Sequence, residues 1–271
     1  MAITAADVKK LRDQTGAGMM DAKKALTEAD GDFEKAAELL RISGATKAAS
    51  RADREASNGL VASAGNALIQ LGAETDFVAK NQEFMDLAAQ IAEAVEAAGA
   101  DGVEAANKVK LPDGQTVAEA IGALSGKIGE KIELVKAARY DGQTHTYLHR
   151  RSPDLPPQVG VMVEFEGTDD QGLIHSVALQ IASMSPSYVH PGEIPADIVD
   201  NEKRIAEATA REEGKPDHII PRIVEGRIKD FFKDVSLRDQ PAISDEKTTV
   251  GQQLDKAGVT VTRFVRFSAG A

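Results

Sequence analysis

The start of the chain carries three short apolar-periodic segments separated by helix breakers, and this spacing constrains the fold more than any other feature. Thr4 and Asp7 form a pair that resembles a capping box and predicts the start of a first helix. Apolar residues at helical spacing predict a second helix over residues 19–28 and a third over residues 33–42. Helices this short bury their apolar faces against one another, so the segment predicts a small helical bundle.

Strand and helix patterns alternate through the middle of the chain. Residues 59–63 and 67–72 are typical of the two strands of a hairpin, and residues 132–138 of a further strand. Between them lies a long helix whose apolar face runs from Phe84 to Val95. This order predicts a small sheet packed against a helix.

A second strand–helix pattern follows the first. We expect strands over residues 147–149 and 159–166 and a helix over residues 173–184. Residues 88–92 (AAQIA) and 178–182 (ALQIA) are nearly identical, and each segment lies in a helix that follows a strand pair. The matching order of elements predicts two related strand–helix subdomains.

Two further helices are expected over residues 198–213 and 219–232, with a short break containing Gly and Pro between them. Ile198 and Ile205 are among the residues expected on the apolar face of the first of these helices. A short break between two amphipathic helices predicts an antiparallel hairpin. The chain then returns to strand, ending with residues 259–267.

Charge and composition exclude several classes of function. The formal net charge is −11 and the pI is about 5.0, so phosphate backbones repel the chain and direct nucleic-acid binding is not expected. The chain contains no cysteine, which excludes disulfides and thiolate chemistry. It contains no apolar run of membrane-spanning length, and its N-terminus lacks the features of a signal peptide, so we expect a cytoplasmic protein.

No catalytic constellation is recognisable in the sequence, and we expect neither an enzyme nor a cofactor. Gly16 and Gly18 are not followed by the Gly-Lys-Ser/Thr of a phosphate-binding loop. His145 and His149 are four residues apart, which suits metal binding on a helix. However, the neighbouring Thr144 favours an extended segment, in which the two rings are poorly paired, so we expect no metal site.

Three features each allow two interpretations. Met19 and Met20 are adjacent in a predicted helix, so either one is exposed for a protein contact or both are partly buried. Phe77 either packs into the core, with Asp76 as a helix N-cap, or protrudes as an aromatic anchor. The helical hairpin is either a structural element or a binding arm.

Several motifs resemble the signatures of the elongation factor Ts family. Residues 15–26 (TGAGMMDAKKAL) resemble its N-terminal signature, and residues 75–81 (TDFVAKN) resemble its second. Three later segments, at residues 224–227, 235–241 and 249–251, match the family in the same order. The resemblance covers essentially the whole chain. It implies an α+β fold with a ubiquitin-associated-like three-helix domain, then a core of two similar α/β subdomains with an antiparallel helical-hairpin insertion.

The resemblance also implies domain boundaries and a function. The expected division is residues 1–45 for the three-helix domain, 46–58 for a linker, 59–140 and 141–271 for core subdomains N and C, and 197–232 for the hairpin. The implied function is that of a translation elongation factor, which binds the GTPase elongation factor Tu in its GDP state and promotes guanine-nucleotide exchange. The alternative is a non-catalytic adaptor protein built on the ubiquitin-associated-like domain.

Carried over position by position, the resemblance implies a set of residues that contact elongation factor Tu. Asp76 and Phe77 match the pair that wedges into the GTPase domain near the magnesium site of the nucleotide. Ser244 departs from the family, which usually has an apolar residue there beside Ile243. Family members also form symmetric pairs of complexes, which implies a possible homodimer of complexes. The implied contact residues are Val8, Leu11, Met19, Met20, Lys23, Asp76, Phe77, Val78, Ile128, His149 and Ile243.

Overall fold

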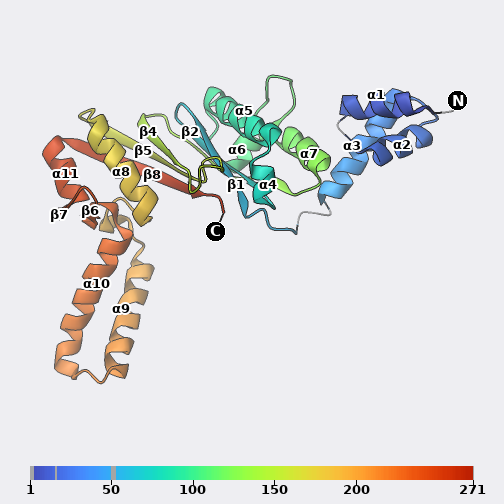
Figure 1. Ribbon diagram of the computed structural model, residues 1–271. Coiled ribbons are helices and arrows are strands. Elements are labelled where there is room, and N and C mark those ends of the chain that lie inside the picture. The colour runs from blue at the N-terminus through green and yellow to red at the C-terminus, as the bar shows by residue number, and fades with distance from the viewer. Residues whose placement is uncertain (1–2, 16, 50–52, 271) are drawn as a thin grey trace. The chain divides into compact units, whose positions relative to one another are not determined.

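The computed structural model describes residues 3–15, 17–49 and 53–270, with the side chains of residues 44–49 left out of the description. The fold is α+β, as the sequence predicts, with three helices preceding a core of mixed helix and sheet (Figure 1). The chain separates into two compact units. Unit 1 comprises residues 1–139, 148–159 and 267–271, and unit 2 comprises residues 140–147 and 160–266.

The N-terminal helices form the predicted bundle. They are α1 (Ala5–Thr15), α2 (Met19–Glu28) and α3 (Phe33–Ala49). The Thr4–Asp7 capping box is present, because the Asp7 amide donates to Thr4 Oγ at 3.2 Å and the Thr4 amide donates to Asp7 Oδ2 at 3.0 Å. The bundle buries a small aliphatic core of Val8, Leu11, Ala22, Ala25, Leu26, Ala29 and Ala36.

The third helix of the bundle is longer than the sequence predicts. The third helix does not end at residue 42, as expected, but continues past Gly44 to Ala49, so part of the expected linker is helical. The residues after Gly44 are rich in alanine, and good helix formers outweigh the roughly 1 kcal/mol that one helical glycine costs. Gly16, in the break before the second helix, and residues 50–52 of the expected linker lie outside the described residues.

Unit 1 also contains a three-stranded sheet in the order β1–β2–β3, formed by β1 (Asn58–Ala64), β2 (Ala67–Ala73) and β3 (Ile132–Arg139). Both neighbouring pairs are antiparallel, and the β1–β2 register places Leu60 opposite Leu71. Alternate residues of β2 enter one core because strand side chains alternate between faces. The predicted hairpin and third strand are therefore confirmed.

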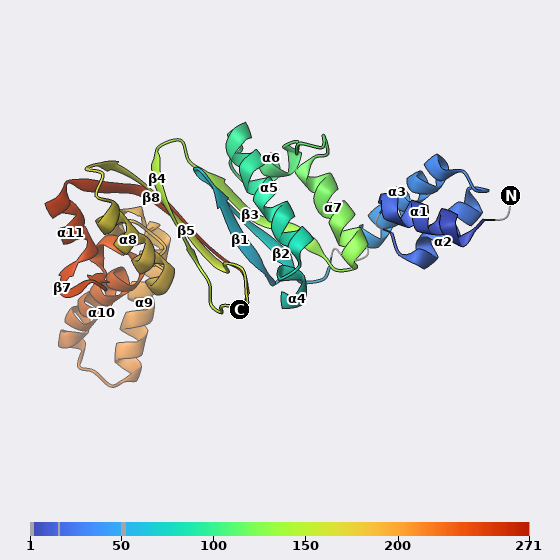
Figure 2. The ribbon, with the colours of Figure 1, turned by 45° about the horizontal axis from the view of Figure 1, so that its top comes forward.

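Helices pack against this sheet through the apolar faces that the sequence predicts (Figure 2). The long helix α5 (Gln82–Ala98) buries Phe84, Leu87, Ala88, Ile91, Ala92 and Val95. The Asn81 side chain caps its N-terminus by accepting from the amides of Glu83 and Phe84. Helix α7 (Val117–Ile128) joins the same core, and two short helices, α4 (Asp76–Ala79) and α6 (Val103–Lys108), complete this part of the unit.

The second sheet has the strand order β4–β5–β8. Its strands are β4 (Gln143–His149), β5 (Val159–Gly167) and β8 (Val259–Ser268), and a core of Val161, Val163, Phe165, Val259 and Val261 joins it to helix α8 (Gln171–Met184). Strand β4 begins four residues before the expected start. A three-stranded sheet covered by a long helix therefore occurs twice in the chain, as the repeated pentapeptide predicts.

The predicted helical hairpin is present as α9 (Ala196–Glu212) and α10 (Ile220–Val235), which lie side by side in Figure 1. The expected buried face of α9 is wrong in part, because Ile198 and Ile205 are exposed while Ala206 and Ala210 are buried. Small residues at the contact allow two helix backbones to approach closely.

The sequence analysis missed the element before the last strand. Helix α11 (Val250–Ala257) follows a small two-stranded sheet of β6 (Pro241–Ala242) and β7 (Asp245–Thr249). The signal was present, because Thr249 and Gln252 form a complete capping box and Gly258 ends the helix in the left-handed conformation. Three single-turn 3-10 helices complete the described elements: Pro191–Glu193, Asp217–Ile219 and Leu237–Asp239.

Candidate partner-binding site

The turn between β2 and α5 holds an aromatic side chain out in solvent. Phe77 is 79% exposed, although phenylalanine is a residue that proteins usually bury. It lies in the single-turn helix α4, whose next two residues, Val78 and Ala79, are buried in the core of unit 1. Two buried neighbours therefore anchor the turn while Phe77 points away from the core. Of the two interpretations of Phe77, the structure supports the protruding anchor.

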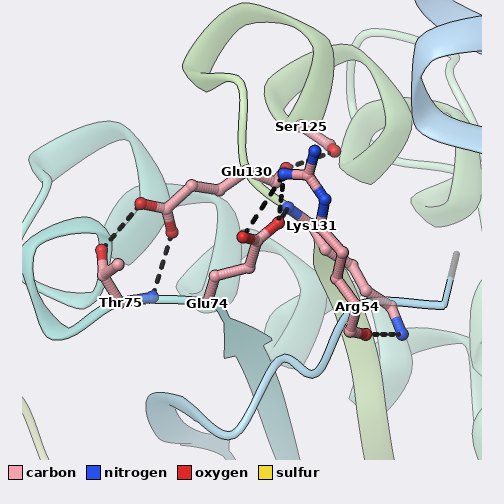
Figure 3. Close-up of polar contacts among 6 residues, drawn as sticks. All are labelled: Arg54, Glu74, Thr75, Ser125, Glu130 and Lys131. Atoms are coloured by element: carbon pink, nitrogen blue, oxygen red, sulfur yellow. Dashed lines mark hydrogen bonds and ion pairs between the residues drawn. The ribbon is translucent and has the colours of Figure 1, made fainter. Parts of the chain in front are cut away.

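Thr75, and not Asp76, is the N-cap of α4, and a carboxylate from another part of the chain fixes it (Figure 3). Thr75 Oγ accepts from the Val78 amide. Glu130 accepts from the Thr75 amide at 3.0 Å and from Thr75 Oγ at 2.8 Å. Bonds to a charged acceptor are stronger than neutral ones, so this clamp restrains the residue on which the turn begins.

The turn after α7 positions the Glu130 carboxylate. Gly129 ends α7 with φ at 91°, a conformation that favours glycine, and so reverses the chain immediately before Glu130. Ser125 Oγ then donates to the Glu130 backbone oxygen at 2.6 Å. Glu130 is thereby fixed through its backbone as well as through its side chain.

A second carboxylate restrains the other side of the turn (Figure 3). Glu74 Oε1 accepts from the Lys131 amide at 2.6 Å and from Arg54 Nη1 at 3.3 Å. The Glu74 backbone oxygen accepts from Asn58 Nδ2 at 2.8 Å. Glu74 and Glu130 together tie the turn to the start of β1 and to the segment between α7 and β3, so Phe77 is presented on a pre-organised support.

Asp76 lies beside Phe77 and takes part in a surface ion pair. Its carboxylate lies 3.3 Å from Lys80 Nζ, one helical turn further on. The same ammonium group lies 5.9 Å from the centroid of the Phe77 ring. Both charged side chains are substantially exposed, so the pair contributes little to stability and remains open to a partner.

The N-terminal bundle presents a second apolar surface. Met19 and Met20 are 47% and 76% exposed, and Lys23 is exposed one turn later on α2. The interpretation in which both methionines are partly buried is therefore wrong for Met20. Val8 and Leu11 lie in the core of the bundle, so they support this surface from within and cannot form it.

The remaining predicted contact residues occupy different environments. Ile128, at the end of α7, is half-buried against the core of unit 1. His149 is exposed at the end of β4. Val78 is buried in the core of unit 1, as Val8 and Leu11 are in the core of the bundle. Direct contact with a partner is accordingly possible for a smaller set than the resemblance implies.

Ile243 is 50% exposed on the tight turn between β6 and β7 in unit 2. The side chain of Gln180, itself only 1% exposed, holds that turn in place. Gln180 Oε1 accepts from the Ile243 amide at 2.9 Å, and Gln180 Nε2 donates to Gln240 Oε1 and to the Pro241 oxygen, each at 3.1 Å. A buried amide with all of these partners fixes the backbone from which Ile243 projects.

Hydrogen bonds lower the pKa of three carboxylates in the described part of the chain. The pKa of Asp7 and that of Glu119 are lowered because each accepts hydrogen bonds from the threonine that it helps to cap. The pKa of Glu164 is lowered first by hydrogen bonds from Arg263, which lies 2.8 Å away. The part of the chain that the structure describes contains no cluster of three or more His, Asp or Glu side chains suited to a metal ion.

A hollow of about 430 Å³ lies in unit 1 between β1, α5 and the loop before β5. Its lining is mixed, with Leu60, Met85 and Pro156 beside the opposite charges of Lys80 and Glu93. The exposed apolar side chains of Phe77 and Ile243 lie on turns that hydrogen bonds hold in place.

Comparison with known proteins assigns the chain to a family. A family model described as elongation factor TS matches residues 74–271. The chain belongs to the elongation factor Ts family. Proteins named elongation factor Ts from Cutibacterium acnes, Mycolicibacterium vanbaalenii and Mycolicibacterium smegmatis are 66%, 59% and 57% identical to it. The first alignment covers all of both chains, and the other two cover 98% of each.

Glu130 and Gln180, which hold the turns that bear Phe77 and Ile243, are not among the residues that the sequence predicts. Nothing local marks Glu130 as the partner of Thr75, because the two are 55 positions apart in the sequence. Gln180 carried a usable signal: it is a polar residue between the buried Ala178 and Ile181 of a helix. A buried amide must find partners, and so it indicates a packed loop or turn nearby.

Proposed function

We propose that this chain is the guanine-nucleotide exchange factor of elongation factor Tu, and that it speeds the release of GDP so that GTP can bind. Membership of the elongation factor Ts family supports this proposal. The observation that carries it is the exposure of Phe77 on a turn that two carboxylates restrain. A rigid aromatic group needs little further ordering on binding, and such groups dominate the energy of many interfaces.

Three surfaces are proposed to contact elongation factor Tu. Asp76 and Phe77 form the wedge that enters the GTPase domain near the nucleotide's magnesium site. Ile128 and His149 are proposed to assist this contact. The other two surfaces are Met19, Met20 and Lys23 on α2, and Ile243 on the β6–β7 turn. Flexible, polarisable methionines suit a surface that adapts to a partner.

Exchange requires a coupling free energy between two ligands of the same GTPase. The factor binds more tightly to a conformation that holds nucleotide poorly, so its binding weakens nucleotide binding. By linkage, the nucleotide must weaken binding of the factor by the same ratio. Displacing the elements around a magnesium ion removes cation bridging between protein and phosphates. Asp76 then either accepts hydrogen bonds from donors that become free or repels nearby negative charge.

No covalent bond forms or breaks in this function, so we propose that the chain is not an enzyme and needs no cofactor. We also propose that it acts in the cytoplasm, where translation takes place. None of the described helices is long and apolar enough to cross a membrane. We propose that residues 1–45 and both core subdomains, 59–140 and 141–271, bind elongation factor Tu, and that residues 46–58 connect the first domain to the core.

The proposal is tested by release of a fluorescent GDP analogue from purified elongation factor Tu after a chase with excess unlabelled GDP. With this chain present at a tenth of the GTPase concentration or less, we expect faster release with multiple turnovers. A control without the chain gives the intrinsic rate. An unchanged release rate at every concentration would contradict the proposal, and a sizing column run in parallel reports whether the complex forms.

A further inference from the structure

Two histidines from separate elements of unit 2 face each other at the molecular surface. His145 lies on β4 and His175 on α8, and His145 Nε2 is 3.1 Å from His175 Nδ1. Their ring centroids are 5.3 Å apart, with the ring planes at 84°. The Tyr147 ring packs edge-on against His175 at 5.5 Å. This pair has no part in the proposed contact with elongation factor Tu.

A chain of hydrogen bonds defines which nitrogen of His145 carries its proton. Gln171 Nε2 donates to the Asp169 carboxylate, which can only accept, so the amide oxygen of Gln171 faces the other way. That oxygen lies 3.3 Å from His145 Nδ1, which must therefore be the protonated nitrogen. His145 Nε2 is left with its lone pair directed at His175. Orientation of an imidazole through its other nitrogen is typical of metal-ligating histidines.

We propose that His145 and His175 form a binding site for a borderline divalent transition-metal ion, with Zn²⁺ as the principal ligand and water completing its coordination. Neutral imidazole is the commonest protein ligand for such ions. Mg²⁺ and Ca²⁺ prefer oxygen ligands and are not expected to bind here.

The separation of the two nitrogens fits a shared metal ion. Zn–N bonds of about 2.0–2.1 Å place two ligand nitrogens about 2.8–3.4 Å apart for angles between right-angled and tetrahedral. The 3.1 Å separation of His145 Nε2 and His175 Nδ1 falls within that range. His175 is exposed, so its ring can turn until both lone pairs converge on the ion.

The protonation of the two imidazole rings makes metal binding depend on pH. An imidazole ring binds a metal ion through the lone pair of an unprotonated nitrogen, so both rings must be neutral in the state that binds metal. In the metal-free pair His175 Nδ1–H donates to His145 Nε2. Metal binding moves that proton to His175 Nε2, so two neutral rings bind the ion without net proton release. Acid competes with the metal because protonation of either ring removes a ligand.

The site differs from the His145–His149 pair that the sequence analysis weighed. Both of those residues lie on β4, and four residues of strand span about 13 Å, which is too far for one ion. His175 is supplied instead by α8, 30 positions after His145. A bound ion would therefore cross-link the strand to the helix that covers its sheet.

The test is calorimetric titration of the untagged full-length chain with ZnCl₂ at pH 7.5. We compare the unaltered chain with His145→Gln and His175→Gln, and use His149→Gln and His218→Gln as matched controls. We expect one saturable site, weakened at least tenfold in each of the first two variants and unchanged in both controls. Circular dichroism of every metal-free variant checks that folding is retained.

A second measurement keeps the proposal testable if a variant fails to fold. Electron paramagnetic resonance of the unaltered chain with one equivalent of Cu²⁺ should show hyperfine coupling to two imidazole nitrogens, and the coupling should be lost below about pH 5, where histidine is protonated. Absence of saturable Zn²⁺ binding would overturn the proposal. So would unchanged affinity in the His145 and His175 variants, or a loss of affinity in His149→Gln.

Discussion

The two helices that carry the repeated pentapeptide use their shared glutamine in different ways. Gln90 in α5 is exposed, whereas Gln180 in α8 is buried and holds the turn that presents Ile243. In unit 1 the corresponding task, presentation of Phe77, is done by the carboxylates of Glu74 and Glu130. A repeated helix therefore fixes the layer architecture, while the non-repeated loops determine which polar residue supports the exposed side chain.

The largest expected difference in stability is between alanine variants of two phenylalanines of unit 1, the buried Phe84 and the exposed Phe77. Phe84, fully buried in α5, should cost about 3–5 kcal/mol of unfolding free energy when changed to alanine, because its removal leaves a cavity. Phe77→Ala should cost less than about 1 kcal/mol, because the ring is exposed. Chemical denaturation of both variants measures the two free energies of unfolding. An equal loss in the two variants would show that the Phe77 ring packs in the core.

The shared glutamine offers a matched pair of variants. Gln180→Ala should cost about 1–3 kcal/mol, because it removes the partners of buried groups that include the Ile243 amide. Gln90→Ala should stay within about 0.5 kcal/mol, because the side chain is exposed. Urea unfolding curves give both values. A similar loss at the two positions would show that the repeat uses its glutamines alike.

Removing the Glu130 carboxylate should lower stability less than Gln180→Ala does, but it should also slow nucleotide exchange. Glu130→Ala removes two hydrogen bonds to Thr75 and should cost about 1 kcal/mol. It should also slow GDP release, because the turn bearing Phe77 loses its pre-organisation. Glu104→Ala, at an exposed ion pair with Lys108, is the control and should change neither quantity. A normal exchange rate in Glu130→Ala would show that the clamp is dispensable.

The smallest effect concerns acid stability in unit 2. Arg263 lowers the pKa of Glu164 below its ordinary value of 4.5, so the folded state favours the ionised form. This stabilisation is present above about pH 4.5 and is lost as pH falls through the lower pKa of the folded state. Melting temperatures of the unaltered chain and Glu164→Gln should differ at neutral pH and converge in acid. A gap that widens in acid would refute this assignment.

Periodicity and caps were sufficient to predict most elements of the fold. The apolar stripe of α5, the hairpin of β1 and β2 and the pairing of α9 with α10 each follow from local sequence. The end of α3 was missed because a single glycine did not break an alanine-rich helix. The buried face of α9 was partly missed because helix packing selected alanines over larger residues.

The candidate site was less accessible to sequence reasoning than the fold. Sequence alone favoured a buried Phe77, because phenylalanine is usually buried, and only the family resemblance marked it as a contact residue. The resemblance also named Val8, Leu11 and Val78, whose side chains are buried. The supports of the site, Glu130 and Gln180, depend on contacts far apart in the sequence, which no local pattern encodes.

We propose that the exposed ring of Phe77 drives nucleotide exchange. This proposal is tested most directly by comparing Phe77→Ala with the unaltered chain in the fluorescent GDP release assay, at matched substoichiometric concentrations and with folding checked by denaturation. Loss of a hot-spot contact of about 2 kcal/mol or more predicts a decrease in exchange activity of at least about thirtyfold, with stability nearly unchanged. Exchange at the unaltered rate in a fully folded Phe77→Ala variant would contradict the account.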